Sequence, residues 1–161
     1  MFQIRKNVFE TNSSSSHSIS YNPSSELKKS ELEIDGDGYI HTELGEFGWA
    51  IHDYTDQKSR LSYLVTMLAE MSGNRCWCLS ASDLEQTIQE INDDIGFKDI
   101  SEEIAAYTGA RGIILDISDG YIDHQSVEFS TMSDFLDDCC CSSVINFVFG
   151  DTIVHTDNDN H

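Results

Sequence analysis

The sequence predicts an α+β fold, in which an antiparallel or mixed sheet carries two main helices on one face. Three observations lead to this prediction. Two segments in the middle of the chain repeat apolar residues at helical spacing, β-rich apolar runs lie toward both ends, and glycines separate the segments. A length of 161 residues, with 39% hydrophobic residues, suffices for one core and is short for two. We therefore expect residues 1–161 to form a single domain.

The N-terminal part is predicted to contain short strands at residues 2–9 and 17–21, on either side of a serine run. A polar loop follows at residues 22–30. Residues 31–52 then alternate weakly around a DGDG sequence, which is a hairpin signal. The DGDG sequence also resembles part of a calcium loop, but Ile40 stands where that loop needs a glycine, so we do not expect calcium there.

Two long helices and one short helix are predicted in the middle of the chain. The first spans residues 56–72 with Asp56 as its N-cap, and the second spans residues 82–96 with a capping box that starts at Ser82. A shorter helix should follow at residues 101–108. Each segment ends at or just before a glycine, which is a common helix stop.

The C-terminal third is predicted to supply most of the sheet. Residues 112–118 and 121–127 flank an Asp-Gly pair and should form a hairpin, and residues 144–149 and 153–155 should form another across a Gly-Asp pair. Between the two hairpins, Ser133 can cap a short helix. The sheet should therefore contain the strands at 112–118, 121–127 and 144–149.

Charge limits the kinds of partner. Twenty-nine acidic residues against nine lysines and arginines give a formal net charge of −20. Direct nucleic-acid binding needs a basic patch that neutralises phosphates, so we do not expect it. An acidic face can instead occupy a basic surface that normally holds DNA or RNA. The alternative is that the charge only keeps the protein soluble.

Cysteine spacing and hydropathy give further expectations. The five cysteines include a C-x-C pair and a consecutive triplet, neither of which has the spacing of a structural zinc site. We expect free thiols, no metal and no cofactor. No stretch approaches the roughly 20 apolar residues of a membrane span, and no secretory signal is evident. We therefore expect a cytoplasmic protein that does not contact a membrane.

The most unusual string is FETNSSSSHS, at residues 9–18. Successive hydroxyl and backbone N–H groups in a turn can surround an anion, and His17 can then act as a general acid or base. The alternative is structural, because serine hydroxyls also satisfy the backbone groups of a tight turn. The candidate ligand-binding residues here are Arg5, Glu10, Asn12, Ser13, Ser14 and Ser15.

A second polar string is DHQS, in which Asp123 can orient the imidazole of His124 for catalysis. Adjacent strand residues point to opposite faces, so these two share a site only at a bulge. Gln125 and Ser126 are candidate ligand-binding residues, and a polar outer face is the alternative role for the whole string.

Two more residues complete the predicted site. Asp157, in the polar segment TDNDN, is expected to converge with the serine run in a pocket for a phosphate-bearing or nucleotide-like ligand. Trp49, in GEFGW, is a candidate aromatic platform for a ring-bearing ligand. The alternative is that GEFGW forms a hydrophobic corner under the first helix. The P-loop, dinucleotide-binding, H-E-x-x-H and G-x-S-x-G motifs are absent, so the enzyme classes that use them receive no support.

These strings together carry a resemblance. The stretch R-x-x-x-F-E-T-N-S-S-S-x-H-S at residues 5–18, with EFGW, YIDHQS and TDNDN farther on, resembles a group of uncharacterised bacteriophage and prophage proteins. The resemblance implies an accessory protein that acts on the bacterial host, and it implies no particular activity. Residues 74–110 and the cysteine triplet lie outside it.

Two functions are therefore predicted. The first is a phage-type accessory protein that inhibits a host or defence protein by covering its basic, nucleic-acid-binding face, in the cytoplasm of the infected cell. The alternative is a small enzyme or binder of a phosphate-bearing ligand, with His17, His124 and Asp123 as the catalytic residues. Whether the protein is an enzyme is left open by the sequence.

Overall fold

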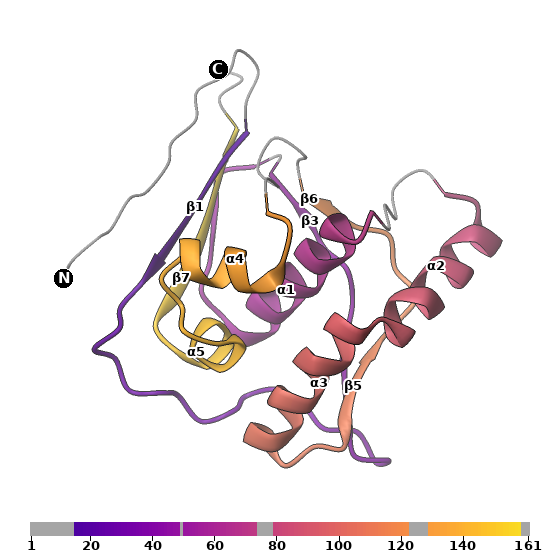
Figure 1. The fold of residues 1–161 in the computed structure, drawn as a ribbon, viewed down its shortest axis with the longest axis horizontal. Helices are drawn as coiled ribbons and strands as arrows, with labels where there is room; N and C mark the ends of the chain where they lie inside the picture. The colour runs from indigo at the N-terminus through magenta and orange to yellow at the C-terminus, as the bar shows by residue number, and fades with distance from the viewer. Residues whose placement is uncertain (1–14, 49, 74–78, 123–128, 159–161) are drawn as a thin grey trace.

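The computed structural model describes residues 15–48, 50–73, 79–122 and 129–158. Within these ranges the chain has a mixed α+β fold, which confirms the predicted class (Figure 1). The helices are α1 (Gln57–Met71), α2 (Ala81–Asp93), α3 (Ile95–Thr108), α4 (Met132–Asp138) and α5 (Val144–Phe149). The strands are β1 (Ser15–Tyr21), β2 (Tyr39–Thr42), β3 (Glu46–Phe47), β4 (His52–Tyr54), β5 (Gly112–Leu115), β6 (Tyr121–Ile122) and β7 (Thr152–Asn158).

The described strands form three small sheets. In the largest, β7 lies between β1 and β4 and is antiparallel to both. β2 pairs with β5, and β3 pairs with β6, in each case in parallel. The predicted strand at 17–21 is thus confirmed and begins two residues earlier, at Ser15. The predicted strand at residues 2–9 lies outside the described residues.

β5 and β6 do not form the predicted hairpin, because the segment that contains them runs parallel to the segment that contains β2 and β3. The Tyr121 N–H donates to the Gly45 carbonyl at 3.0 Å between the two pairs of strands. A Cβ on Gly120 would lie 2.6 Å from the Leu44 Cβ and 2.8 Å from the Gly45 backbone. Gly120 therefore permits a close approach of two chain segments. The remainder of the predicted strand at 121–127 lies outside the described residues.

Residues 144–149 form the helix α5, so the strand and the hairpin predicted there are wrong. Ser143 caps the helix by accepting from the Asn146 N–H at 3.2 Å. Val144, Phe147 and Val148 are buried, which is helical spacing. A short apolar run is compatible with either a buried strand or a buried helix. The N-cap at Ser143 favours the helix here. The predicted strand at 153–155 is confirmed as part of β7.

The hairpin predicted within residues 31–52 is also wrong. The DGDG turn is present, since the Asp35 carboxylate accepts from the Asp37 and Tyr39 N–H groups at 2.9 and 2.8 Å. The strand that follows it, β2, pairs with β5 and not with the residues before the turn. A distant partner has therefore replaced the local one.

The helices of the middle region are confirmed, with corrected caps. Asp56 caps α1 through the Ser59 N–H at 2.8 Å. Ser80, not Ser82, caps α2, and the Asp94 carboxylate caps α3 through the Gly96 N–H at 2.8 Å. Residue 96 therefore lies in the first turn of α3 and does not end α2. The short predicted helix at 101–108 is the second half of α3.

The cap of α4 also differs from the prediction, since Thr131 and not Ser133 accepts from the Asp134 N–H, at 3.1 Å. The opposite end of α4 is closed by a Schellman motif. There the Cys140 N–H donates to the Asp137 carbonyl and the Cys141 N–H to the Leu136 carbonyl, at 3.1 and 2.9 Å. Cys140 takes the left-handed position of this motif, with φ of 59°.

The core lies around α1, which is surrounded by the other elements (Figure 1). Most residues of α1 are buried. Tyr63 of α1 is 1% exposed, and its ring makes an edge-to-face contact with Phe47 at 4.9 Å between centroids. Phe135 and Phe147 pack edge to face beside it, at 5.5 Å. This aromatic cluster joins β3, α1, α4 and α5.

Candidate functional site

His17 is the only predicted catalytic residue within the described ranges, and its ring is directed toward α1. It lies in β1 opposite Thr156, whose side chain is fully buried. The His17 Nδ1 and the Tyr63 hydroxyl are 3.2 Å apart. Burial raises the pKa of Tyr63, so its hydroxyl stays neutral and keeps this hydrogen bond over the accessible pH range. These contacts link β1 to α1 through His17, and its role as a general acid or base stays a prediction.

Two other predicted residues are described. Asp157 pairs with Ser16, and because strand side chains alternate, Asp157 and His17 point to opposite faces of the sheet. The backbone of Ser15 pairs with that of Asn158. The remaining predicted residues lie outside the described residues, so the composite pocket stays a prediction. They are Arg5, Glu10, Asn12, Ser13, Ser14, Trp49, Asp123, His124, Gln125 and Ser126.

The GEFGW segment is described up to Gly48. Phe47 is 3% exposed and packs edge to face against Tyr54 and Tyr63, with centroids 5.0 and 4.9 Å away. Glu46 is exposed and lies in β3 opposite Tyr121. The phenylalanine therefore belongs to a hydrophobic corner under α1, as the structural alternative for this segment predicted.

The strand register brings together a serine, a histidine and an aspartate on the other face of the β1–β7–β4 sheet. Ser18 and Asp53 are the two cross-strand neighbours of His155. The His155 Nδ1 lies 2.5 Å from the Asp53 carboxylate, while Val154 and Thr156, on either side of His155, are buried on the core face. The carboxylate fixes the imidazole orientation and leaves Nε2 for a partner.

Ser18 is an exposed neighbour of this ring. Directly opposed residues on antiparallel strands have Cβ atoms about 4.5–5.5 Å apart, so the register places Ser18 beside His155. Nucleophilic hydrolases use the same three residue types, with the serine hydroxyl hydrogen-bonded to the histidine. The sequence contained Ser18 inside the serine run, but nothing local to it indicated the two distant partners.

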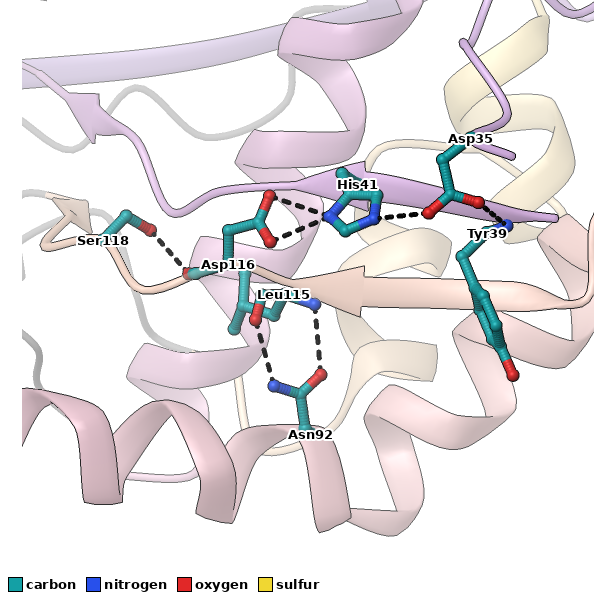
Figure 2. A network of polar contacts seen from close by, with 7 residues as sticks. All are labelled: Asp35, Tyr39, His41, Asn92, Leu115, Asp116 and Ser118. Carbon is teal, nitrogen blue, oxygen red and sulfur yellow. Dashed lines mark hydrogen bonds and ion pairs between the residues drawn. The ribbon is translucent and has the colours of Figure 1, made fainter. Parts of the chain in front are cut away.

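A second polar cluster centres on His41 of β2 and joins the turn before β2 to the residue that follows β5. His41 is held between two carboxylates, with Nδ1 2.8 Å from Asp116 and Nε2 2.9 Å from Asp35 (Figure 2). The hydrogen bonds to Asp116 and then to Asp35 raise the pKa of His41. Next to it, the Asn92 amide bonds both the N–H and the carbonyl of Leu115, at 3.1 Å each, which ties α2 to β5. The cluster is thus an exposed ionic link between loops.

The outer surface of α2 is an open groove of about 630 Å³. Its lining contains four carboxylates and no basic residue, and residues 79–97 contain neither lysine nor arginine. Two amides fix two of the carboxylates, because Gln86 donates to Glu90 at 2.9 Å and Gln89 donates to Asp93 at 3.0 Å. The groove residues are Ser82, Glu85, Gln86, Gln89, Glu90, Asp93 and Asp94.

Over the described part of the chain, no group of three or more His, Cys, Asp and Glu side chains is arranged to hold a metal ion. The helices of the same ranges are all too short or too polar to cross a bilayer. No protein-family model, curated protein or solved structure matches this chain. The resemblance to phage proteins therefore stays a prediction.

Proposed function

We propose that the protein is a phage-type accessory protein that binds a basic surface of a host or defence protein through the acidic groove of α2. The observation that carries the proposal is that four carboxylates and no basic residue line this groove. A nucleic-acid-binding face presents lysines and arginines at the spacing of phosphates, and a row of carboxylates can replace the phosphates there. Inhibition then results from competition with the nucleic acid.

Fixed carboxylates strengthen such a complex. Side chains that are already held in one rotamer lose less entropy on binding, and Glu90 and Asp93 are held by the neighbouring amides. The second oxygen of Glu90 can accept from a partner's lysine or arginine, whereas that of Asp93 already lies 3.8 Å from Lys98 Nζ, an exposed ion pair that a partner's cation has to displace. Long-range attraction by the net charge of −20 also speeds the encounter.

The test is affinity capture from host lysate with the wild-type protein and two triple variants of equal charge. Glu85→Gln, Glu90→Gln and Asp93→Asn remove three of the four groove carboxylates, and the control replaces the exposed Glu26, Glu33 and Glu43 with glutamine. Asp83 is left unchanged because its carboxylate accepts from the cap residue Ser80.

We expect a partner at low salt, about a tenfold loss of affinity in the groove variant, and weaker capture at about 0.5 M NaCl for every protein. Competition by duplex DNA for the captured partner is expected as well. Equal affinities of the two triple variants would exclude the groove, and capture that does not change with salt would exclude the electrostatic basis.

A second candidate function rests on the row formed by Ser18, His155 and Asp53. We propose group transfer or hydrolysis with Ser18 as the nucleophile and His155 as the general base, because the carboxylate orients the imidazole next to the serine. Labelling with an active-site-directed fluorophosphonate tests it. We expect modification of Ser18 in the wild type and none in His155→Ala, whereas equal labelling of both proteins, or none, would rule out an activated serine.

A further inference from the structure

The turn that closes α4 contains three consecutive cysteines in two environments. Cys140, at the left-handed position, is exposed, whereas Cys139 and Cys141 are only 8% and 1% exposed. The Schellman geometry produces this division, because it reverses the chain direction within one residue. The two residues that flank Cys140 therefore direct their thiols into the same part of the core.

Both buried thiols contact backbone carbonyls of the same turn. The Cys139 thiol donates to the Leu136 carbonyl at 3.3 Å. The Cys141 thiol points toward the preceding residues of the turn and lies 3.8 Å from the carbonyl oxygen of Cys139. Neither thiol is in a disulfide. A pair of thiols in one turn is a dithiol, whose chemistry differs from that of three independent cysteines.

The two thiols also differ in acidity. The neighbouring Cys141 thiol, followed by the backbone N–H groups of the turn, favours the thiolate of Cys139 and lowers its pKa, against the effect of burial. The same thiol contact, together with burial, raises the pKa of Cys141. One sulfur is thus favoured as a nucleophile, and the other keeps its proton until it reacts.

We propose that Cys139 and Cys141 form a peroxide-reactive dithiol that closes to an intramolecular disulfide, with Cys140 left as a free thiol. The substrate class follows from access, because only a small oxidant such as hydrogen peroxide reaches a thiol that is 8% exposed. Larger electrophiles react first with the exposed Cys140.

The reaction has two balanced steps. The Cys139 thiolate attacks one oxygen of hydrogen peroxide, the O–O bond breaks, and the second oxygen leaves as hydroxide, which gives Cys139 sulfenic acid. The Cys141 sulfur then attacks the Cys139 sulfur, the S–O bond breaks, and the thiol proton leaves with the hydroxide as water. Two thiols lose two electrons in total, and one peroxide molecule becomes two molecules of water.

The sequence makes the test direct in the wild-type protein. Arg111 is the last lysine or arginine, so trypsin leaves all three cysteines of the turn in one peptide, residues 112–161, while Cys76 and Cys78 fall into the peptide 76–98. After treatment with hydrogen peroxide and alkylation under denaturing conditions, we expect the peptide 112–161 to carry one alkyl group and to have lost two hydrogens. Three alkyl groups on this peptide would overturn the proposal.

Variants identify the pair. Cys140→Gly keeps both buried thiols and suits the left-handed position, so we expect the same loss of two hydrogens and no alkyl group on that peptide. Cys141→Ala removes the resolving thiol, and Cys139 should then be trapped by dimedone as a sulfenic acid. Absence of the disulfide in Cys140→Gly would show that Cys140 takes part and would overturn the assignment. If Cys141→Ala does not fold, fragmentation of the oxidised wild-type peptide and Cys140→Gly decide the question.

Discussion

At the scale of single residues, the guanidinium of Arg60 is the most deeply buried charge among the described residues. Its Nη1 donates to the carbonyls of Gly150 and Thr152, at 2.8 and 2.9 Å, and so joins α1 to the start of β7. Burial lowers the pKa of Arg60, but a guanidinium is not deprotonated in proteins. The positive charge is therefore retained inside the protein.

Replacing Arg60 tests what this contact contributes. Arg60→Met leaves two buried carbonyls without donors, so we expect the free energy of unfolding to fall by about 2–4 kcal/mol in urea denaturation. Lys58→Met, on an exposed position of the same helix, is the control and should change stability by less than about 0.5 kcal/mol. A stable Arg60→Met would mean that packing of the methionine outweighs the loss of both hydrogen bonds.

Cys140 offers the opposite case, a residue whose backbone conformation suits another amino acid. A residue with a Cβ pays about 1 kcal/mol in the left-handed region, and glycine does not. We therefore expect Cys140→Gly to raise the free energy of unfolding by about 0.5–1 kcal/mol. Cys140→Ala removes the thiol but keeps the Cβ and should give no such gain. Equal stabilities of the two variants would contradict the assignment of the strain to the backbone.

At the scale of elements, the parallel run of β2 and β3 beside β5 and β6 depends on contact between the two backbones at Gly120. In Gly120→Ala the new methyl group meets the Gly45 backbone at 2.8 Å, where no side-chain rotation relieves the clash. We expect a loss of more than about 2 kcal/mol in the free energy of unfolding.

The matched control for Gly120→Ala is Gly36→Ala, since no atom lies within 4 Å of that added Cβ. The change should be close to neutral. Similar stabilities of the two alanine variants would instead support the hairpin turn that the sequence predicted.

The link between β2 and β5 through His41 is expected to depend on pH. The folded-state pKa of His41 is raised, so its contribution to stability is complete below about pH 6.5 and is lost as the pH rises through the raised value. The difference in unfolding free energy between wild type and His41→Asn should therefore be larger at about pH 5.5 than at about pH 8.5. The hydrogen bond from the Tyr39 N–H, followed by that from His41, lowers the pKa of Asp35, so its carboxylate stays ionised at both values.

His52→Asn, at another exposed histidine, is the control for a general effect of histidine loss. It should show a smaller change between the two pH values than His41→Asn. If the His41→Asn difference is the same at both pH values, the ionic link does not form in solution.

Local signals predicted the elements and missed how they pair. Asp56 and the spacing that follows it identified α1, because capping and periodicity are encoded within one helix. The parallel pairing of β2 with β5 joins residues about 70 positions apart, which no local pattern encodes. The candidate site shows the same limit. Ser18 lay inside the predicted serine run, yet only the register of β7 reveals His155 and Asp53 as its neighbours.

At the scale of the whole molecule, repulsion among like charges opposes folding. The net charge is −20, and of the described basic side chains Arg60 is buried while Lys28 and Lys98 lie within 4 Å of an aspartate. Added salt screens the remaining repulsion, so we expect the melting temperature to rise by a few degrees between about 20 and 300 mM NaCl. The groove variant, with a net charge of −17, should show a smaller rise. A melting temperature that falls with salt would mean that the described ion pairs dominate.

The order of strands in the largest sheet has a consequence for how the chain acquires its structure on the ribosome. β1 leaves the exit tunnel on the order of ten seconds before β7, its partner, has been synthesised, because about 130 residues separate the paired positions. Until then, β1 has an unpaired edge to which another nascent chain can add. Four of its seven residues are serines, and a polar strand of this kind resists such intermolecular addition better than an apolar one. The serine-rich composition of β1 thus protects the chain during the interval in which its own partner is still missing.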